Sequence, residues 1–294
     1  MKSFEYHEPE TVEEATGLLS RYGGKAQILA GGIDLIPRMR RGDLEPEHII
    51  NIQNIEGLGH INPAEGGGIT FGAAVKLRSI EVSAVIWSRY PILYEAIHQI
   101  ASVQTKYMGT AAGNLCVATP ASDLATALLA LGANLKIAGR DGERSEPLEK
   151  FYVDYRLTSL DRSEMVTQVM LPGPRPGTGT AFLNLVRTHA DIAKIIVAAS
   201  MLVENGICRE ARIAIGAAAP TVMRPAKAEN SLVGREIRSG VIENAAEMAA
   251  EEIKPMTDLR STAGYRREMT RVLVERALER ALQRVNHTGK KRCD

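Results

Sequence analysis

The residues best suited to chemistry in this sequence form two short segments of small side chains. Residues 30–35 read Ala-Gly-Gly-Ile-Asp-Leu, and residues 109–116 read Gly-Thr-Ala-Ala-Gly-Asn-Leu-Cys. A loop without bulky Cβ groups lets several backbone N–H groups approach one anion together. Because the chain has two such loops, the sequence favours an extended anionic cofactor whose pyrophosphate is held between them. For Gly31 and Gly32 taken alone, a tight turn without a ligand is the alternative.

No other set of side chains forms a recognisable catalytic site. Neither loop has the dinucleotide pattern G-x-G-x-x-G, and the sequence contains no G-x-x-x-x-G-K-[ST] motif. Cys116, Cys208 and Cys293 have no metal or cluster spacing, and we expect the first two to be small buried residues. His98 and His189 belong to no triad or metal motif, so we expect solvated or structural histidines. The chemistry is therefore expected to belong to a bound cofactor.

Composition and charge exclude several classes of protein. The chain has 294 residues, 45% hydrophobic and 24% charged, with a net charge of +1. These values are typical of a soluble globular protein and lack the basic surplus of a nucleic-acid-binding protein, so no nucleic-acid partner is expected. The longest mainly apolar run, residues 195–203, is too short to span a membrane, and the first residues lack the apolar core of a signal peptide. We therefore expect a cytoplasmic protein.

The elements that must position the two loops can be predicted from spacing. A capping box at residues 11–14 begins a helix that ends at Gly23-Gly24, and a short strand at residues 26–30 leads into the first loop. Asp34 is a candidate N-cap for the short helix that follows, and residues 48–52 form the next strand. The first unit is therefore expected to be a small β-α-β arrangement.

The second loop lies in a longer stretch of mixed elements. We expect a hairpin from strands at 58–61 and 69–72, a helix from Pro91, a helix opened by Thr119-Pro120, and a strand at 135–137. The proline- and glycine-rich residues 171–177 predict a connection between two domains. Beyond it, Asn205-Gly206 predicts a hairpin, followed by helices at 241–253 and 262–285.

Taken in order, the motifs resemble one known family, the FAD-binding medium subunit of molybdenum hydroxylases such as xanthine dehydrogenase and aerobic carbon monoxide dehydrogenase. The motifs that carry the resemblance run through nearly the whole chain: residues 30–35, 113–116, 120–124, Arg187, 191–193, 216–221, 229–234 and 265–267. The resemblance implies an α+β fold. A two-subdomain FAD-binding region of the vanillyl-alcohol-oxidase (PCMH) type would occupy residues 1–174, divided into about 1–57 and 58–174. A C-terminal domain with a small antiparallel sheet and helices would occupy 178–286.

The same resemblance implies which residues bind FAD. The first loop would hold one side of the pyrophosphate, the second loop the other, and the acidic residue at position 123 the adenosine part. Without the resemblance, an equally good interpretation of the acidic residue at position 123 is that it only stabilises the start of a helix through the helix dipole. The implied cofactor-binding residues are Leu29, Ala30, Gly31, Gly32, Ile33, Asp34, Leu35, Ile36, Ile100, Thr110, Ala111, Ala112, Gly113, Asn114, Asp123, Met165 and Asn184.

Four departures from the family pattern bear on FAD binding. Ile33 stands where threonine is usual, Ala112 replaces one glycine of a pair, Lys106-Tyr107 replaces Arg-Asn, and Asn184 replaces a lysine. Backbone donors survive a change of side chain, so the first two changes need not abolish binding. Ala112 would be strained if its position needed a positive φ.

The implied function is electron transfer. An FAD-carrying subunit would pass electrons from [2Fe-2S] clusters through flavin to an external acceptor. The candidates for this acceptor are NAD, a quinone and oxygen. Substrate oxidation would occur on a molybdenum-cofactor large subunit, a small subunit would carry the clusters, and the assembly would be a dimer of heterotrimers. Because of the four departures, a flavin-free scaffold subunit is the alternative. A free-standing oxidase of the same fold is a third possibility.

Overall fold

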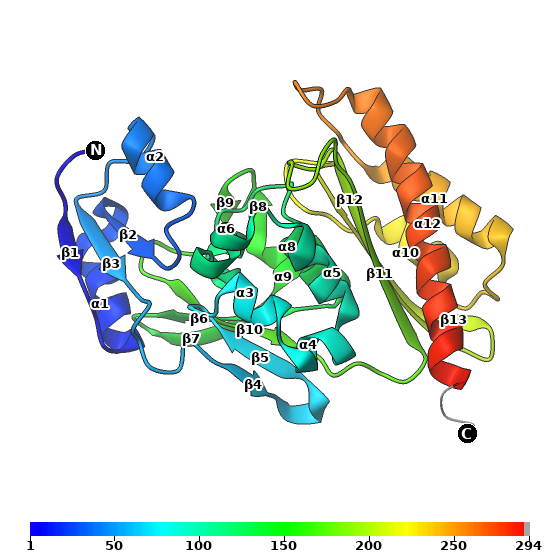
Figure 1. Cartoon of the computed structure of the whole chain (residues 1–294), viewed down its shortest axis with the longest axis horizontal. Helices are drawn as coiled ribbons and strands as arrows, with labels where there is room; N and C mark the ends of the chain where they lie inside the picture. Colours follow the sequence, from blue (N-terminus) through cyan, green and yellow to red (C-terminus); the bar gives the residue numbers. More distant parts are fainter. Residues whose placement is uncertain (291–294) are drawn as a thin grey trace.

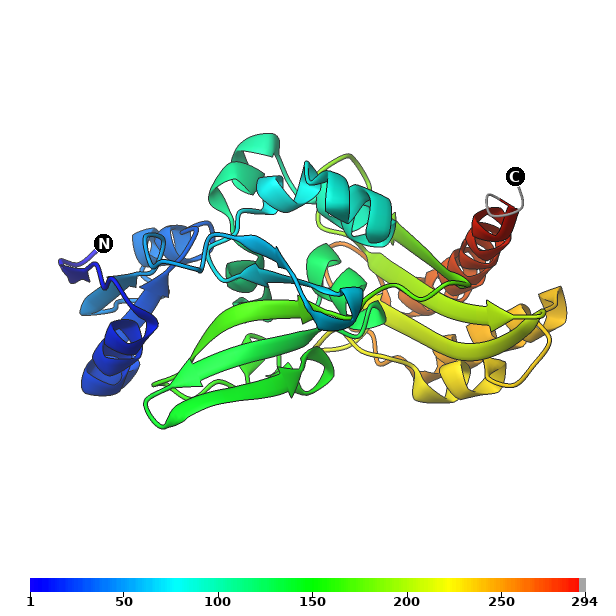
Figure 2. The same ribbon diagram turned by 90° about the horizontal axis from the view of Figure 1, so that it is seen from below.

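The computed structural model describes residues 1–290, which form three parts arranged side by side (Figures 1 and 2). The first part is a parallel sheet of strand order β1-β3-β2. Its strands are β1 (Glu5–His7), β2 (Ala26–Leu29) and β3 (His48–Asn51), with helices α1 (Val12–Tyr22) and α2 (Leu35–Arg41). The first loop lies between β2 and α2, so it begins at the carboxyl end of a parallel strand.

The second part is an antiparallel sheet of strand order β4-β5-β10-β6-β7, accompanied by short helices. The second loop lies here: residues 109 and 110 connect two of these helices, and residues 111–116 form the second of the two. The strands are β4 (Ile61–Pro63), β5 (Ile69–Gly72), β6 (Asn134–Gly139), β7 (Gly142–Pro147) and β10 (Met165–Leu171), with a separate pair β8 (Tyr152–Asp154) and β9 (Leu157–Thr158). The helices are α3 (Leu77–Glu81), α4 (Ala84–Arg89), α5 (Pro91–Gln99), α6 (Val103–Met108), α7 (Ala111–Cys116), α8 (Asp123–Ala130) and α9 (Leu148–Phe151).

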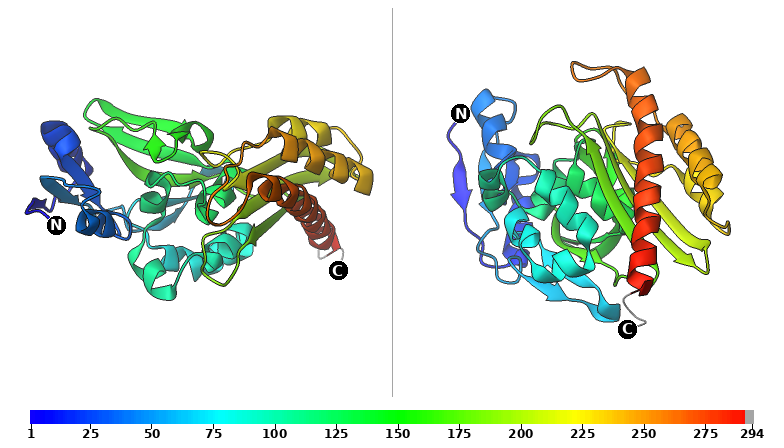
Figure 3. Two further views of the ribbon diagram at one scale, coloured as in Figure 1. Left: turned by 90° about the horizontal axis from the view of Figure 1, so that it is seen from above. Right: turned by 45° about the vertical axis from the view of Figure 1, so that its right-hand side comes forward.

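The third part is a three-stranded antiparallel sheet, β11-β12-β13, with three helices. Its long helix α12 lies across β11 and β12, with α11 beside it (Figure 3). The opposite face of the sheet contacts α5 and α8 of the second part. The bounds are β11 (Thr178–Leu185), β12 (Ile195–Glu204), β13 (Ile207–Gly216), α10 (Ala226–Leu232), α11 (Ser239–Glu252) and α12 (Ala263–Lys290).

Strand β12 explains the longest apolar run in the sequence. Successive side chains of a strand point to opposite faces, and here both faces are covered. Ile196 and Ala198 belong to the core shared with the second part, whereas Ile195, Val197 and Ala199 belong to the core under α11 and α12. The run is therefore a strand buried on both sides. Within residues 1–290, no helix is long and apolar enough to cross a membrane.

The α+β fold class and most predicted elements are confirmed. The strands on either side of the first loop, the helix beginning at Pro91, the Asn205-Gly206 hairpin and the two C-terminal helices all form. Gly132, with φ +70°, follows α8 as expected for a helix stop. The chain therefore follows most of the local signals given by caps, prolines and the Asn-Gly turn.

Two predicted boundaries are wrong. The first strand of the early hairpin occupies Ile61–Pro63 instead of residues 58–61, because it pairs with β5 only from Ile61 onward. The helix expected from Thr119-Pro120 begins at Asp123, because the Ser122 side chain accepts the N–H of Ala125 and so caps the helix there.

One buried arginine ties α12 to the sheet. The Arg266 guanidinium donates to the carbonyl oxygens of Lys194 (2.7 Å) and Ala217 (2.8 Å), and to Asp258 Oδ1 (2.8 Å). The Arg266 side chain is almost fully buried, so little water could take its place as hydrogen-bond donor to these oxygen atoms. Arg271, on the same helix, pairs with Glu268 and Glu275 at the surface.

We predict that Arg266→Met lowers the free energy of unfolding by about 2–4 kcal/mol, because it leaves two carbonyl oxygens without their donor and removes a charged partner of Asp258. The matched change Arg271→Met should cost no more than about 0.5 kcal/mol, since exposed ion pairs contribute little. Urea unfolding of the two variants measures the difference. Equal losses would contradict the anchoring role of Arg266.

Candidate functional site

The two small-residue loops lie against each other. A Cβ added at Gly31 would lie 2.5 Å from the Met108 carbonyl oxygen and 2.8 Å from Gly109 Cα. Both distances are far below van der Waals contact, and both neighbours are backbone atoms, which cannot rotate aside. A side chain at position 31 would therefore push the loops apart, so glycine is required for their contact.

The first loop presents a run of free backbone donors. Gly32 has φ +72°, a conformation that glycine adopts without strain. The N–H groups of residues 31–35 donate to no protein acceptor within residues 1–290. Unpaired N–H groups are costly to bury, and consecutive ones form the usual cradle for an anion. This loop therefore fits a phosphate or pyrophosphate group through its backbone.

Most N–H groups of the second loop already have acceptors within the chain. Thr110 caps α7, and its Oγ1 accepts the Gly113 N–H at 3.1 Å, while the Ala111 N–H bonds to Val75 O at 3.1 Å. In the part of the chain that the structure describes, the Ala112 N–H has no acceptor. Ala112 lies in the first turn of α7 and is not among the positive-φ residues, so this position does not need a positive φ. The strain considered for Ala112 is absent.

Asp34 is the N-cap residue of α2, as predicted, but its side chain makes no capping hydrogen bond. Instead, both carboxylate oxygens accept from Arg156, each at 3.2 Å, and one also accepts from Arg38 at 3.5 Å. The Arg156 N–H donates to Ala118 O at 2.9 Å, just beyond α7. Arg156 therefore links the first loop to the residues just after α7, the helix formed by residues 111–116 of the second loop.

A chain of polar contacts connects the second loop to the third part of the fold. Ser122 Oγ donates to Asn114 Oδ1 at 2.7 Å, and Asn184 Nδ2 on β11 donates to Asp123 Oδ1 at 3.2 Å. Burial raises the pKa of Asp123 to about 7, and the Asn184 hydrogen bond only partly opposes it. The carboxyl group can therefore exist in either charge state near neutral pH.

The remaining candidate residues differ in how far they are exposed to solvent. Ile33 in the first loop and Cys116 in the second are exposed, which corrects the expectation that Cys116 is buried. Ile100 is partly buried, and Met165 has no exposed surface in its place on β10. Ala30 and Leu35 are buried, and the other residues of the set are at least partly exposed except Thr110, Ala111 and Ala112.

Outside the two loops, the expectations for Cys208, His98 and His189 are confirmed, whereas one arginine of the site was not predicted. Cys208 is buried as expected, His98 Nδ1 lies 3.1 Å from Glu81 Oε1 in a structural cluster, and His189 is exposed. Cys293 lies outside the described residues. Sequence reasoning missed Arg156 altogether, because nothing local indicates that it pairs with a residue in the first loop. Its positive φ of 56° within the turn after β8 is the kind of signal that only coordinates reveal.

The comparisons with known proteins decide the family. Residues 2–174 match the model described as FAD binding domain in molybdopterin dehydrogenase, and residues 180–281 match the CO dehydrogenase flavoprotein C-terminal domain. The chain belongs to the FAD-binding medium subunits of the molybdenum hydroxylase family. Both small-residue loops lie within the FAD-binding match.

Several medium subunits are similar over their whole length. The carbon monoxide dehydrogenase medium chain of Hydrogenophaga pseudoflava is 32% identical over 281 residues, covering 96% of this chain and 98% of its own. Subunit alpha of the 6-hydroxypseudooxynicotine dehydrogenase complex of Paenarthrobacter nicotinovorans is 34% identical, with 97% of each chain covered. The solved carbon monoxide dehydrogenase structure from H. pseudoflava superposes with a TM-score of 0.93 at 33% identity, over 96% of this chain and 98% of that one.

For this medium subunit, the raised pKa of Asp123 predicts pH-dependent stability. When the pKa of a carboxyl rises on folding, the folded state favours the protonated group. The wild type should therefore lose stability as the pH rises from the pKa of Asp123 in the unfolded chain towards about 7. Relative to Asp123→Asn, we expect a loss of about 2 kcal/mol between pH 5.5 and pH 8.5 in the apoprotein. Urea unfolding at both pH values measures it, with the exposed Asp141→Asn as control. A pH-independent difference would show that Asp123 keeps an ordinary pKa.

Proposed function

We propose that FAD binds across the two loops, with its pyrophosphate on the backbone of the first. The observation that carries this proposal is the run of unpaired N–H groups at residues 31–35, held against the second loop by the Gly31 contact. Ile33 donates its N–H as threonine would, so the loss of the usual hydroxyl leaves most of the cradle in place. The proposed contacts comprise residues 29–36 and 110–114.

The adenosine part is proposed to lie near Asp123, at the start of α8. Asn184 donates to this carboxyl and so orients it, and the neighbouring Ser122 donates its hydroxyl to Asn114 in the second loop. Ile100 is proposed to line the cofactor as well. Met165, fully buried, supports the sheet beneath the site and is the weakest member of the set.

The chain's own residues are proposed to bind and orient the flavin. When bound, FAD supplies redox chemistry that links one-electron and two-electron carriers. The described hydrogen bonds of Thr110, Ser122 and Asp123 join them to backbone or amide groups, so these side chains form no nucleophile–base pair. We therefore propose an electron-transfer subunit that passes electrons from [2Fe-2S] clusters to an external acceptor.

The partners are proposed to be a molybdenum-cofactor large subunit and a [2Fe-2S] small subunit, in a dimer of heterotrimers. Two observations support this. The similar proteins are named medium chains or complex subunits, and large apolar side chains stand exposed on and beside α4, including Val82, Val85 and Trp87. We also propose that the two domains are residues 1–174 and 178–286. The thiols of Cys116 and Cys208 form no disulfide, which supports the proposal that the protein is located in the cytoplasm.

The loop contact gives a direct test of cofactor binding. We predict that Gly31→Ala weakens FAD retention at least tenfold, because the added Cβ meets Met108 O and Gly109 Cα and must separate the loops. Gly17→Ala, in α1 with no atom near the added Cβ, should retain FAD like the wild type. Flavin absorbance after gel filtration measures retention. Equal FAD content in both variants would contradict the proposed site, and colourless wild-type protein that takes up no FAD would favour the scaffold alternative.

The subunit proposal is tested by native affinity purification of the tagged chain from its own cell. Two further polypeptides, molybdenum and iron should elute with it, and adding substrate should bleach the flavin absorbance of the complex. A chain that elutes alone and oxidises a substrate by itself would instead identify a free-standing oxidase.

A further inference from the structure

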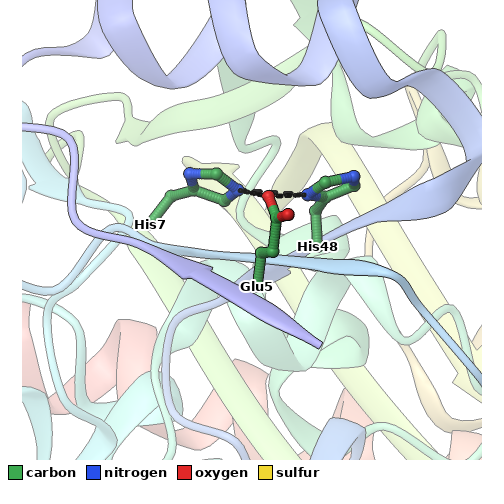
Figure 4. A group of neighbouring side chains, drawn as sticks. All are labelled: Glu5, His7 and His48. Carbon is green, nitrogen blue, oxygen red and sulfur yellow. Dashed lines mark hydrogen bonds and ion pairs between the residues drawn. The ribbon is translucent and has the colours of Figure 1, made fainter. Parts of the chain in front are cut away.

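Two histidines and a glutamate converge on strands β1 and β3 of the first sheet, outside the residues proposed to bind the cofactor. His7 Nε2 lies 3.2 Å from His48 Nδ1, and Glu5 Oε2 lies 3.2 Å from His48 Nδ1 and 3.9 Å from His7 Nε2. Figure 4 shows the carboxylate directed at the gap between the two rings. The three ligand atoms all lie within 4.8 Å of one another.

The strand register brings these side chains together. Glu5 and His7 are two residues apart on β1, so their side chains share one face of the sheet. His48 is the direct partner of Glu5 across the parallel pair β1 and β3. The Tyr22 ring at the end of α1 stacks on His48, with ring centres 3.6 Å apart, and on His7 at 5.3 Å. Both imidazoles are therefore held in place before any ligand arrives.

Hydrogen bonding alone satisfies this arrangement poorly. One proton between the two ring nitrogens can serve only one acceptor, yet His48 Nδ1 faces both a ring nitrogen and a carboxylate oxygen at 3.2 Å. A metal ion would accept a lone pair from all three atoms at once. Two nitrogens bound to one tetrahedral zinc ion at about 2.0–2.1 Å lie roughly 3.3–3.4 Å apart, close to the distance found here.

We propose that Glu5, His7 and His48 bind one divalent transition-metal ion, zinc, with water in the remaining position. Imidazole and carboxylate together suit zinc, whereas magnesium prefers oxygen ligands and retains its water. The Glu5 side chain is 71% exposed, so the ion can enter from solvent and keep its water ligand. Because β1 has only three residues, the ion would fix this edge strand to β3.

The proposal is tested on the full chain as purified, stripped with a chelator and titrated with zinc in a competition assay. One zinc ion should bind per chain, and tenfold excess magnesium should not displace it. His7→Gln and His48→Gln should each weaken binding at least tenfold. His60→Gln, at an exposed histidine outside the cluster, is the matched control and should bind like the wild type.

Two further measurements keep the result independent of folding defects. Zinc should raise the melting temperature of the wild type and of His60→Gln but not of His48→Gln, and the zinc-free variants should melt within a few degrees of the wild type. Zinc-edge X-ray absorption of the wild type should show imidazole ligands. A chain that binds no zinc, or one whose zinc affinity and absorption spectrum are unchanged in both histidine variants, would overturn the proposal.

Discussion

The contact between Gly31 and the backbone at Met108 and Gly109 is the constraint on which the site depends. It joins a loop of the parallel sheet to a loop between two short helices, and it leaves no room for even one methyl group. The loop that holds the unpaired N–H groups of residues 31–35 therefore lies directly against the second loop.

Polar side chains then hold the two loops in register with the rest of the fold. Asp34 and Arg156 join the first loop to the turn after β8, while Asn114 and Ser122 join the second loop to α8. Asp123 and Asn184 continue this connection to β11. These three pairs of side chains hold the candidate site in place without a ligand, which favours a pre-formed site.

Local signals predicted the elements around the site, and the ordered motifs predicted the family. The strand before Ala30, the helix from Pro91 and the Asn205-Gly206 hairpin follow from propensity and turn chemistry over a few residues. The Asp34–Arg156 pair joins residues 122 positions apart, so no local pattern contains it. The convergence of Glu5, His7 and His48 depends on strand register for the same reason, and periodicity alone does not give register.

Strand β12 has a consequence for how the molecule unfolds. Its alternate side chains complete two separate hydrophobic cores, one shared with the FAD-binding region and one under α11 and α12. Neither core can be exposed without disturbing the backbone that serves the other. The two domains are therefore thermodynamically coupled, and heating should melt them together in a single cooperative transition instead of one after the other.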